Sequence, residues 1–194
     1  MSLITKLKNH KTDTYHRFKE MIRTPMFVWG HEGLSTQGKN PAYFSHPFIL
    51  RPDGVGYSRP VCKHTDFVKN VVFEILGMNG YELNTIHRMN LNMTYAQDGN
   101  QRTPIHVDHE FPHQNLLIYF DSHNEGEGGQ VIVEDEEYYP KEDDAIVFGG
   151  LPHSVILPHK GFRTALVTTF TAGYSGGDAV ANIPTTVMDE SIKV

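Results

Sequence analysis

The sequence is short of the features that mark secreted, membrane-spanning and nucleic-acid-binding proteins. Its single cysteine, Cys62, cannot form an internal disulfide, so a reducing compartment is the simpler expectation. No stretch approaches about 18 consecutive apolar residues, and no N-terminal apolar run resembles a signal peptide. We therefore expect a soluble, cytoplasmic protein without a membrane partner. The formal charge of −6 comes without a basic run, which disfavours nucleic acid, because that partner would demand phosphate neutralisation.

No internal repeat divides the 194 residues, which suit one domain with a substantial core. Apolar patterns with strand character occur at 27–29, 42–50, 115–120, 131–133, 145–148 and 162–170. Helical spacing predicts helices over 14–23 and 66–76. Residues 1–13 are expected to be a loose start or a first helical turn, and 173–194 a tail. The chain should therefore be mainly β with flanking helices.

His106 and Asp108 are the first two residues of a candidate metal site. In an extended chain, side chains i and i+2 project from one face, so both can reach one ion. The pattern alone carries little weight, because 12 histidines among 194 residues make about 0.7 such pairs expected by chance. A second pair, His64 and Asp66, precedes a helical pattern, where Thr65 or Asp66 is better interpreted as a helix N-cap.

His153 and Arg163 distinguish the first pair from the second. His153 follows a predicted strand and a Gly-Gly-Leu-Pro turn. Two histidines and one carboxylate on one face of an octahedron leave three positions open, the arrangement of non-haem Fe(II) oxygenases. Arg163 begins the last predicted strand and shares a face with Ala165, Val167 and Thr169. An arginine facing inward is costly unless an anion pairs with it, and its planar fork suits a carboxylate. Each residue taken singly has an ordinary structural explanation, whereas together they indicate a metal site with an acidic co-substrate.

The stretch resembles the Fe(II)/2-oxoglutarate-dependent dioxygenases of the prolyl-4-hydroxylase-like branch. The family pattern comprises His106/Asp108, Gly128-Gly129-Gln130-Val131, Pro140 through Asp144 to Phe148, His153 and Arg163. The match covers about residues 86–171, and the region from Pro25 to Tyr57 resembles small phage and bacterial hydroxylase-like members. The resemblance implies that residues 1–194 form one oxygenase domain. Its fold would be a double-stranded β-helix (jelly-roll, cupin-like) with the metal at one open end.

The resemblance also implies roles for individual side chains. The residues that would hold Fe(II) are His106, Asp108 and His153. The residues that would hold 2-oxoglutarate are Arg163 and Tyr119 at its far carboxylate, with Val131 packed against it.

One assignment stays open on the strand before the metal pair. Relatives often place a tyrosine near the co-substrate there, and residues 84–95 alternate between two faces. One face ends in Tyr95, and the other carries Arg88, Asn90 and Asn92. Either face could approach the co-substrate, so Tyr95 and Asn92 are both candidates.

The reaction implied by the resemblance is hydroxylation of a C–H bond, with release of succinate and CO2 from 2-oxoglutarate. O2 is the oxidant, and ascorbate is a further candidate cofactor. The branch favours a prolyl or other peptidyl substrate, with a free amino acid as a second option. A phage-encoded enzyme acting in the host cytoplasm fits the phage-like members. Asp108 favours hydroxylation over halogenation, since relatives that halogenate lack that carboxylate.

Three alternatives remain at this point. A nucleic-acid demethylase of the same superfamily is disfavoured, because those relatives carry a second arginine six residues after the first, where this chain has Thr169. A barrel that binds metal or a small ligand without turnover is the second. A zinc or manganese cupin acting without a keto acid is the third, and it leaves Arg163 unexplained.

Neighbouring segments give weaker expectations. The loop at 96–104 is expected near the active-site mouth. His109, with His113 and His123 nearby, could contact substrate, although an exposed histidine is the simpler interpretation. The ten acids and one lysine within 121–144 are expected to form solvated turns.

Overall fold

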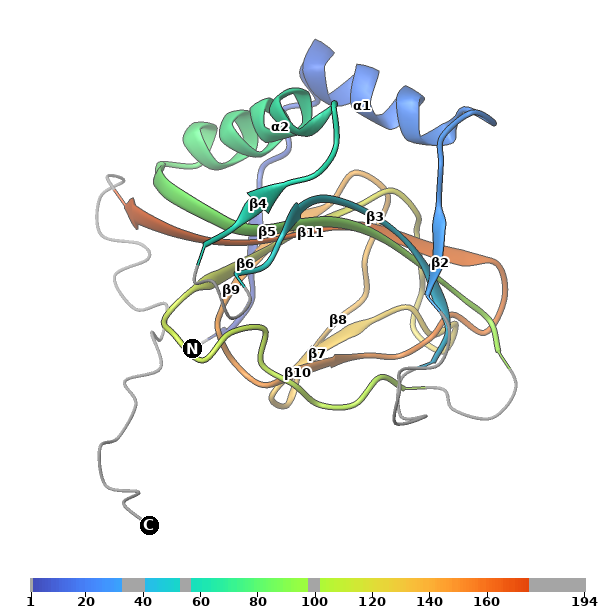
Figure 1. Cartoon of the computed structure of the whole chain (residues 1–194). Coiled ribbons are helices and arrows are strands. Elements are labelled where there is room, and N and C mark those ends of the chain that lie inside the picture. The colour runs from blue at the N-terminus through green and yellow to red at the C-terminus, as the bar shows by residue number, and fades with distance from the viewer. Residues whose placement is uncertain (1, 33–40, 53–56, 98–101, 175–194) are drawn as a thin grey trace.

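The computed structural model describes residues 2–32, 41–52, 57–97 and 102–174 (Figure 1). The helices in these ranges are α1 (Asp13–Arg23) and α2 (Thr65–Met78). The strands in these ranges are β1 (Thr5–Leu7), β2 (Gly30–Glu32), β3 (Tyr43–Leu50), β4 (Arg59–Pro60), β5 (Tyr81–Tyr95), β6 (Gln114–Tyr119), β7 (Val131–Val133), β8 (Glu136–Tyr138), β9 (Ala145–Gly149), β10 (His153–Val155) and β11 (Phe162–Tyr174). Neither described helix has the length and hydrophobicity that crossing a membrane requires.

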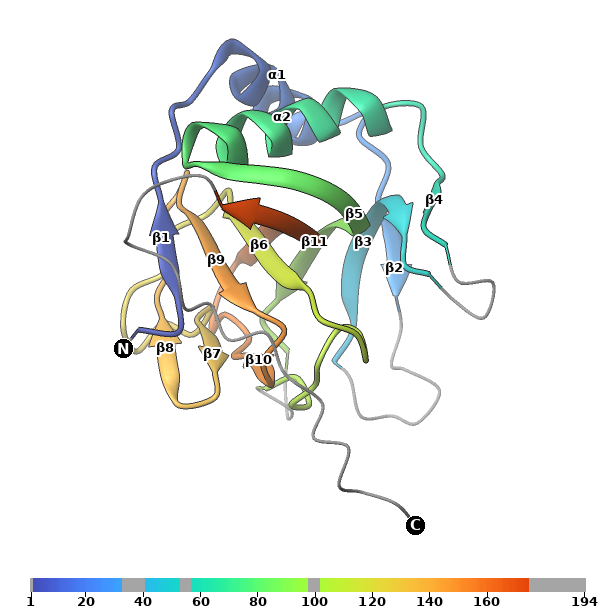
Figure 2. The same ribbon diagram turned by 90° about the vertical axis from the view of Figure 1, so that its left-hand side faces the viewer.

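Two antiparallel sheets face each other in a jelly-roll arrangement. The larger sheet has the strand order β1-β9-β6-β11-β5-β3-β2, with β4 paired to β3, and the smaller sheet has the order β10-β7-β8. In Figure 1 the sheets form an upper and a lower layer, and Figure 2 shows both helices lying over the outer face of the larger sheet. The expectation of a mainly β, jelly-roll fold with flanking helices is confirmed.

Alternation along the central strands divides the apolar side chains between two cores. On β6, Leu116 and Ile118 pack toward the helices, whereas Leu117 and Tyr119 pack between the sheets. Strands β9 and β11 divide their side chains in the same way. The outer core fixes the helices, and the inner core forms the floor on which the site is built.

The predicted helices are present, but the N-cap expected for α2 is wrong. Helix α1 begins after Thr12, whose side chain accepts a hydrogen bond from the amide of Tyr15. Helix α2 begins after His64, which makes no side-chain capping bond. Thr65 lies inside the helix, and its hydroxyl donates to the carbonyls of Phe48, at 2.9 Å, and Cys62, at 2.6 Å. This threonine therefore ties α2 to β3.

The N-terminal expectations need correction. The residues expected to be a loose start include β1, which pairs with β9 at the edge of the larger sheet (Thr5 opposite Val147). The strand expected at 27–29 lies instead at 30–32 and pairs with β3. Pro47 lies in β3 between the pairings with β2 and β4, at a register irregularity with β5. That position suits a residue that cannot donate to a ladder.

The acidic segment is more than a solvated turn, because Asp143 anchors α1. Its carboxylate accepts from the Tyr15 hydroxyl at 2.6 Å and pairs with Lys11 at 2.9 Å and with Lys19. Burial alone would raise the pKa of Asp143, but bonds from Lys19, Tyr15 and Lys11 hold it well below its usual range. The expected tail is shorter than predicted: β11 runs to Tyr174, and the remaining residues lie outside the described part, as do residues 98–101 of the expected rim loop.

Candidate active site

His106 and His153 are held together by their own backbones. The amide of each donates to the carbonyl of the other, at 3.0 Å and 2.9 Å. This antiparallel bridge fixes the segment before His106 against β10. The two imidazole rings consequently lie with their centroids 4.5 Å apart.

Backbone carbonyls also fix which nitrogen of each ring is free. Nδ1 of His106 lies 3.0 Å from the carbonyl oxygen of Pro104, and Nδ1 of His153 lies 2.9 Å from that of Leu151. A carbonyl oxygen only accepts, so each Nδ1 carries the hydrogen and each Nε2 keeps its lone pair. This is the second contact that orients a metal-binding histidine.

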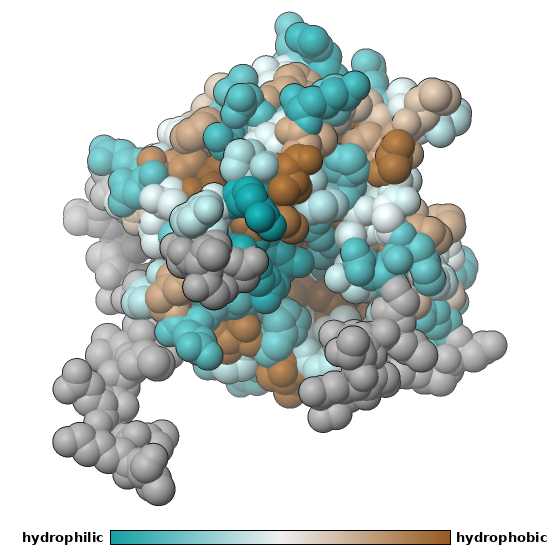
Figure 3. All heavy atoms as spheres, viewed as in Figure 1, coloured by the Kyte–Doolittle hydropathy of each residue, from teal (hydrophilic) through white to brown (hydrophobic). Residues whose placement is uncertain are grey.

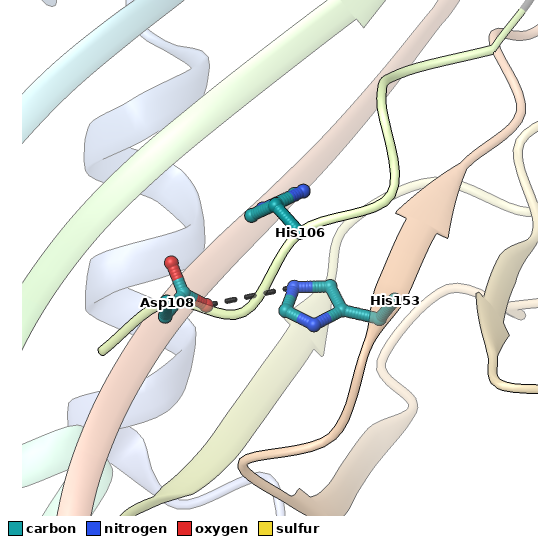
Figure 4. Close-up of side chains that lie close together, drawn as sticks. All are labelled: His106, Asp108 and His153. Atoms are coloured by element: carbon teal, nitrogen blue, oxygen red, sulfur yellow. Dashed lines mark ion pairs between the residues drawn. The ribbon is translucent and has the colours of Figure 1, made fainter. Parts of the chain in front are cut away.

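Asp108 completes the group. Single ligand atoms of His106, Asp108 and His153 all lie within 4.8 Å of one another, and Figure 4 shows the three side chains converging. Oδ2 of Asp108 lies 3.5 Å from Nε2 of His153. The structure therefore brings together all three residues that the sequence predicted as metal ligands.

The protonation states suit a divalent cation. Burial alone would raise the pKa of Asp108, but Arg88, then His153, His106 and Arg51, outweigh it and lower the pKa. Burial lowers the pKa of His153, against the opposing charge of Asp108. The carboxylate is thus charged and the imidazole neutral, the states in which both bind metal. With two nitrogen donors, one oxygen donor and fixed Nδ1 partners, the residues fit an iron ion.

A cavity of about 490 Å³ opens beside these ligands. Figure 3 shows the face of the molecule seen in Figure 1, with hydrophilic residues around a hollow that has hydrophobic residues at its floor. The apolar wall consists of Leu117, Val131, Val155 and Val167. The charged residues that line it are Arg51, Arg88, Asp108 and Arg163.

Arg163 lies at the inner end of the cavity and is only 2% exposed. Its Nε donates to the carbonyl of Gly129 at 2.8 Å, and its Nη2 lies 3.5 Å from the hydroxyl of Tyr119. None of the ion pairs among the described residues includes Arg163. A buried guanidinium without a carboxylate partner is costly unless an anionic ligand supplies one.

Tyr119 and Val131 occupy the positions that the resemblance assigned to them. Both are fully buried in the inner core, and Val131 lines the cavity. The guanidinium carbon of Arg163 lies 5.1 Å from the Tyr119 ring centroid. Burial raises the pKa of Tyr119 to about 12, against the opposing charge of Arg163, so its hydroxyl stays protonated.

The Gly-Gly turn before β7 allows the main chain to approach Arg163. Gly129 has φ +84°, and a Cβ there would lie 2.4 Å from the ring of His123. Gly128 has φ +75°, and a Cβ there would lie 2.1 Å from the carbonyl oxygen of Leu157. Only glycine fits both positions, which explains why two glycines stand where the arginine receives its carbonyl.

On β5, the polar face approaches the cavity and Tyr95 does not. Asn92 and Thr94 line the cavity, and Asn90 donates to the side chain of Asn92. Tyr95 points to the opposite face, with its ring 5.6 Å from that of Phe44. Because side chains alternate along a strand, Asn92 and Tyr95 cannot both face the co-substrate. The candidate role of Tyr95 is therefore incompatible with its position.

Two further arginines reach the open end of the site. Oδ1 of Asp108 accepts from Arg88 at 2.9 Å and from Arg51 at 3.3 Å. Arg88 pairs across β5 and β11 with Thr169. A second guanidinium therefore does reach this end, from the neighbouring strand. Sequence reasoning missed Arg51, since it follows β3 directly before a Pro-Asp-Gly turn and carries no periodic signal.

The histidines near the site are less exposed than expected. His109 is partly buried, stacks on Phe111 and lies 2.7 Å, through Nε2, from the Thr169 hydroxyl. Burial, followed by the charge of His113, lowers the pKa of His109 to about 4. His113 and His123 are 2% and 6% exposed. The interpretation of His109 as an exposed histidine is wrong, because the aromatic cluster covers it.

In sequence, the chain matches no family profile, and no curated protein is similar to it. In three dimensions it is similar to solved oxygenases. A 2OG-Fe(II) oxygenase family oxidoreductase from Burkholderia pseudomallei has a TM-score of 0.66 and 13% identity, over 89% of this chain and 86% of that one. The viral collagen prolyl hydroxylase of Paramecium bursaria Chlorella virus-1 has a TM-score of 0.54 and 13% identity, over 87% and 95% of the chains.

A third similar structure is a prolyl hydroxylase from Trichoplax adhaerens, solved with a hypoxia inducible factor peptide fragment. Its TM-score is 0.54 with 15% identity, over 87% of this chain and 83% of that one. Identities this low compare folds and leave the residue-level chemistry to the site itself. The chain has the fold of the 2-oxoglutarate/Fe(II) oxygenases, with prolyl hydroxylases among its structural neighbours.

Proposed function

We propose that this protein is an Fe(II)- and 2-oxoglutarate-dependent dioxygenase that hydroxylates a C–H bond. The observation that carries the proposal is the coexistence, in one cavity, of a converging His-Asp-His group and a buried arginine without a carboxylate partner. The first suits a divalent cation and the second suits the far end of a diacid. A site for metal alone would leave the second feature without a purpose.

His106, Asp108 and His153 would hold the iron. When bound, the iron activates O2 and supplies the oxidising chemistry. The electrons and atoms balance through the co-substrate: 2-oxoglutarate loses CO2 and becomes succinate, which receives one atom of O2. The other oxygen atom enters the C–H bond of the substrate. The Nδ1 contacts and Arg88 keep the three ligand side chains in place throughout.

Arg163, supported by the Gly129 carbonyl and the Tyr119 hydroxyl, would bind the far carboxylate of 2-oxoglutarate. Val131 would pack against the carbon chain, and Asn92 would offer an amide beside it. The apolar wall excludes water and strengthens each charged contact. The protein's own contribution is thus orientation and a dry compartment.

The substrate class follows from the resemblance and remains the least determined part. A prolyl or other peptidyl residue is favoured, with a free amino acid as the alternative. Ascorbate would keep the iron reduced. We also place the protein in the cytoplasm, encoded by a phage or a bacterium, since the resemblance to small phage hydroxylase-like members points there.

Two other functions would use the same site differently. A nucleic-acid demethylase has gained one argument, because Arg88 supplies a guanidinium opposite Thr169. The charge of −6 still weighs against a polyanionic substrate. A binding module without turnover would use Arg163 and the metal group but release no succinate.

The test is a coupled assay with purified protein, Fe(II), ascorbate and 2-oxoglutarate, in which succinate is measured. Slow uncoupled turnover that His153→Ala and Asp108→Ala abolish would support the oxygenase. Tight 2-oxoglutarate binding without succinate under every condition would favour the binding module instead. A protein that binds metal but no keto acid would leave only the zinc or manganese cupin.

A further inference from the structure

The described lining of the cavity carries more positive than negative charge. Three arginines, Arg51, Arg88 and Arg163, face one carboxylate, that of Asp108. A divalent ion and a doubly charged co-substrate would cancel each other and leave that excess unchanged. Two positive charges therefore remain in this lining after the proposed ligands are bound. Uncompensated charge in a cavity favours a further anion.

The two ends of the cavity hold these cations separately. Along β11 and β5, Arg163 pairs with Thr94, and Arg88 pairs with Thr169 six positions further on. Six residues of an extended strand span about 20 Å. Arg163 is buried at the inner end, whereas the side chain of Arg51 is 48% exposed. The exposed end is the one a primary substrate would enter.

Asp108 does not need both of its arginine partners. The same oxygen, Oδ1, accepts from Arg88 at 2.9 Å and from Arg51 at the longer distance of 3.3 Å. The Arg88 side chain is 16% exposed and fixed in β5, whereas Arg51 lies beyond the end of β3. Arg88 suffices to position the carboxylate. The guanidinium of Arg51 keeps donors for a second anion, since it carries five N–H groups.

We propose that Arg51 receives a carboxylate of the primary substrate, with the excess positive charge at this end of the cavity assisting. This rests on the proposed function and specifies its substrate: a molecule whose oxidised carbon lies close to a free carboxylate. Two sources share that chemistry, the α-carboxylate of a free amino acid and the side chain of an acidic residue in a peptide. A nucleic-acid strand fits less well, because the chain's charge of −6 repels successive phosphates.

The test begins with 2-oxoglutarate binding to the full chain loaded with Mn(II), measured without O2. This step examines the proposed function alone. The second step measures succinate release with Fe(II), 2-oxoglutarate and a panel of probes, together with oxygen addition to the probe by mass spectrometry. The panel pairs the twenty free L-amino acids with their amides, and N-acetyl-Asp and N-acetyl-Glu methylamides with their Asn and Gln counterparts.

The expected result is stimulation by at least one carboxylate and by none of the matched amides. Free amino acids and acidic methylamides then distinguish the two sources. Arg51→Gln should raise the KM of the active probe about 10- to 100-fold, the loss expected for a charge-assisted bond, with Arg51→Lys intermediate. The matched control is Arg59→Gln, an exposed arginine on β4 that does not line the cavity, which should change neither KM.

Three results would overturn the inference while leaving the oxygenase proposal intact. Amides could stimulate as well as acids do. The whole panel could be silent although 2-oxoglutarate binds. Arg51→Gln could weaken 2-oxoglutarate binding in the first step, which would assign this arginine to the co-substrate. Failure of the wild-type protein to bind 2-oxoglutarate at all is a different outcome, and it removes the proposed function itself.

Discussion

Arg88 donates to Asp108 across 2.9 Å, and the bond occupies the carboxylate oxygen that faces away from His153. It leaves Oδ2, 3.5 Å from Nε2 of His153, for an ion. A carboxylate with one oxygen held by a fixed guanidinium presents the other in a defined direction. The metal group is thus organised before any ion arrives.

The first prediction concerns metal binding. Asp108→Ala and His153→Ala should each lower Mn(II) affinity by at least about 100-fold, because one of three ligands is lost. Isothermal titration calorimetry on the purified variants measures this directly. The chain offers a matched control in its second His-x-Asp pair, at the start of α2. His64→Ala with Asp66→Ala should bind Mn(II) as the wild type does, and loss of binding in that double variant would point away from the assigned ligands.

The second prediction concerns Arg88 as a positioning residue. Arg88 is the first-ranked charge that lowers the pKa of Asp108 against burial. In Arg88→Gln that pKa should rise, so the carboxylate is protonated at a higher pH and Mn(II) affinity begins to fall at a higher pH. Titrations of Mn(II) binding between pH 5 and 8 check this, a window of about three units around neutrality. Arg88→Lys should recover part of the shift, and coincident profiles for all three proteins would contradict the role.

The metal group was predictable from sequence because its logic is local. His106 and Asp108 need only an extended backbone to share a face, and His153 and Arg163 sit on strands with clear apolar alternation. Alternation also separated Asn92 from Tyr95 correctly. It could not say which face points inward, since that depends on the strands packed above and below. Register between β5 and β11 settles the question.

Features that depend on distant pairing were out of reach. β1 pairs with β9 across about 140 residues of sequence, and three residues of polar chain give no signal for it. Arg51 enters the site because β3 ends beside the segment that carries Asp108. Asp143 was assigned to solvent because a run of acids usually is solvated, whereas its partners come from α1. In each case the missing information was a contact partner.

The third prediction concerns Arg163. Arg163→Met should weaken 2-oxoglutarate binding by about 100-fold or more, since a buried charge-assisted contact is lost. Without ligand the variant should be at least as stable as the wild type, because it removes a buried charge that has no carboxylate partner among the described residues. Calorimetric titration and thermal unfolding measure the two effects.

Tyr119→Phe gives the matched comparison. Its hydroxyl is 3.5 Å from Nη2 of Arg163, at the limit of a hydrogen bond, so affinity should fall only a few-fold. Equal losses in both variants, or unchanged affinity in Arg163→Met, would contradict the assignment of the diacid's far end.

The fourth prediction concerns stability in acid. Asp143→Asn removes the anchor of α1 and should cost about 1–3 kcal/mol of unfolding free energy at neutral pH. The pKa of Asp143 is lowered in the folded protein, so its stabilisation is complete above the ordinary aspartate pKa of about 3.9. It is lost as pH falls from there through the folded value. The difference between the two proteins in urea denaturation should therefore shrink below about pH 4.

Asp135→Asn is the control for that series, since Asp135 is exposed in the turn between β7 and β8. It should leave the unfolding free energy unchanged at every pH. A constant difference between wild type and Asp143→Asn down to the acid transition would show that the Lys11, Lys19 and Tyr15 contacts do not act through the charge.

The last prediction separates backbone conformation from contact at the Gly-Gly turn. Gly129→Ala places a Cβ 2.4 Å from the ring of His123, in a backbone with φ +84°. Gly126→Ala meets only the second problem, since Gly126 has φ +81° and nothing within 4 Å of an added Cβ. The strain alone should cost Gly126→Ala about 1 kcal/mol, and Gly129→Ala should lose several times that amount.

The two variants should also differ in function. The Gly129 carbonyl accepts from Nε of Arg163 at 2.8 Å, so a shift of this turn displaces the guanidinium. Gly129→Ala should therefore weaken 2-oxoglutarate binding by about 10-fold or more, whereas Gly126→Ala should not. Folded fraction is checked first by circular dichroism at low temperature. If Gly129→Ala folds and binds the co-substrate as the wild type does, the turn does not position Arg163, and the arginine's own packing against Tyr119 must suffice.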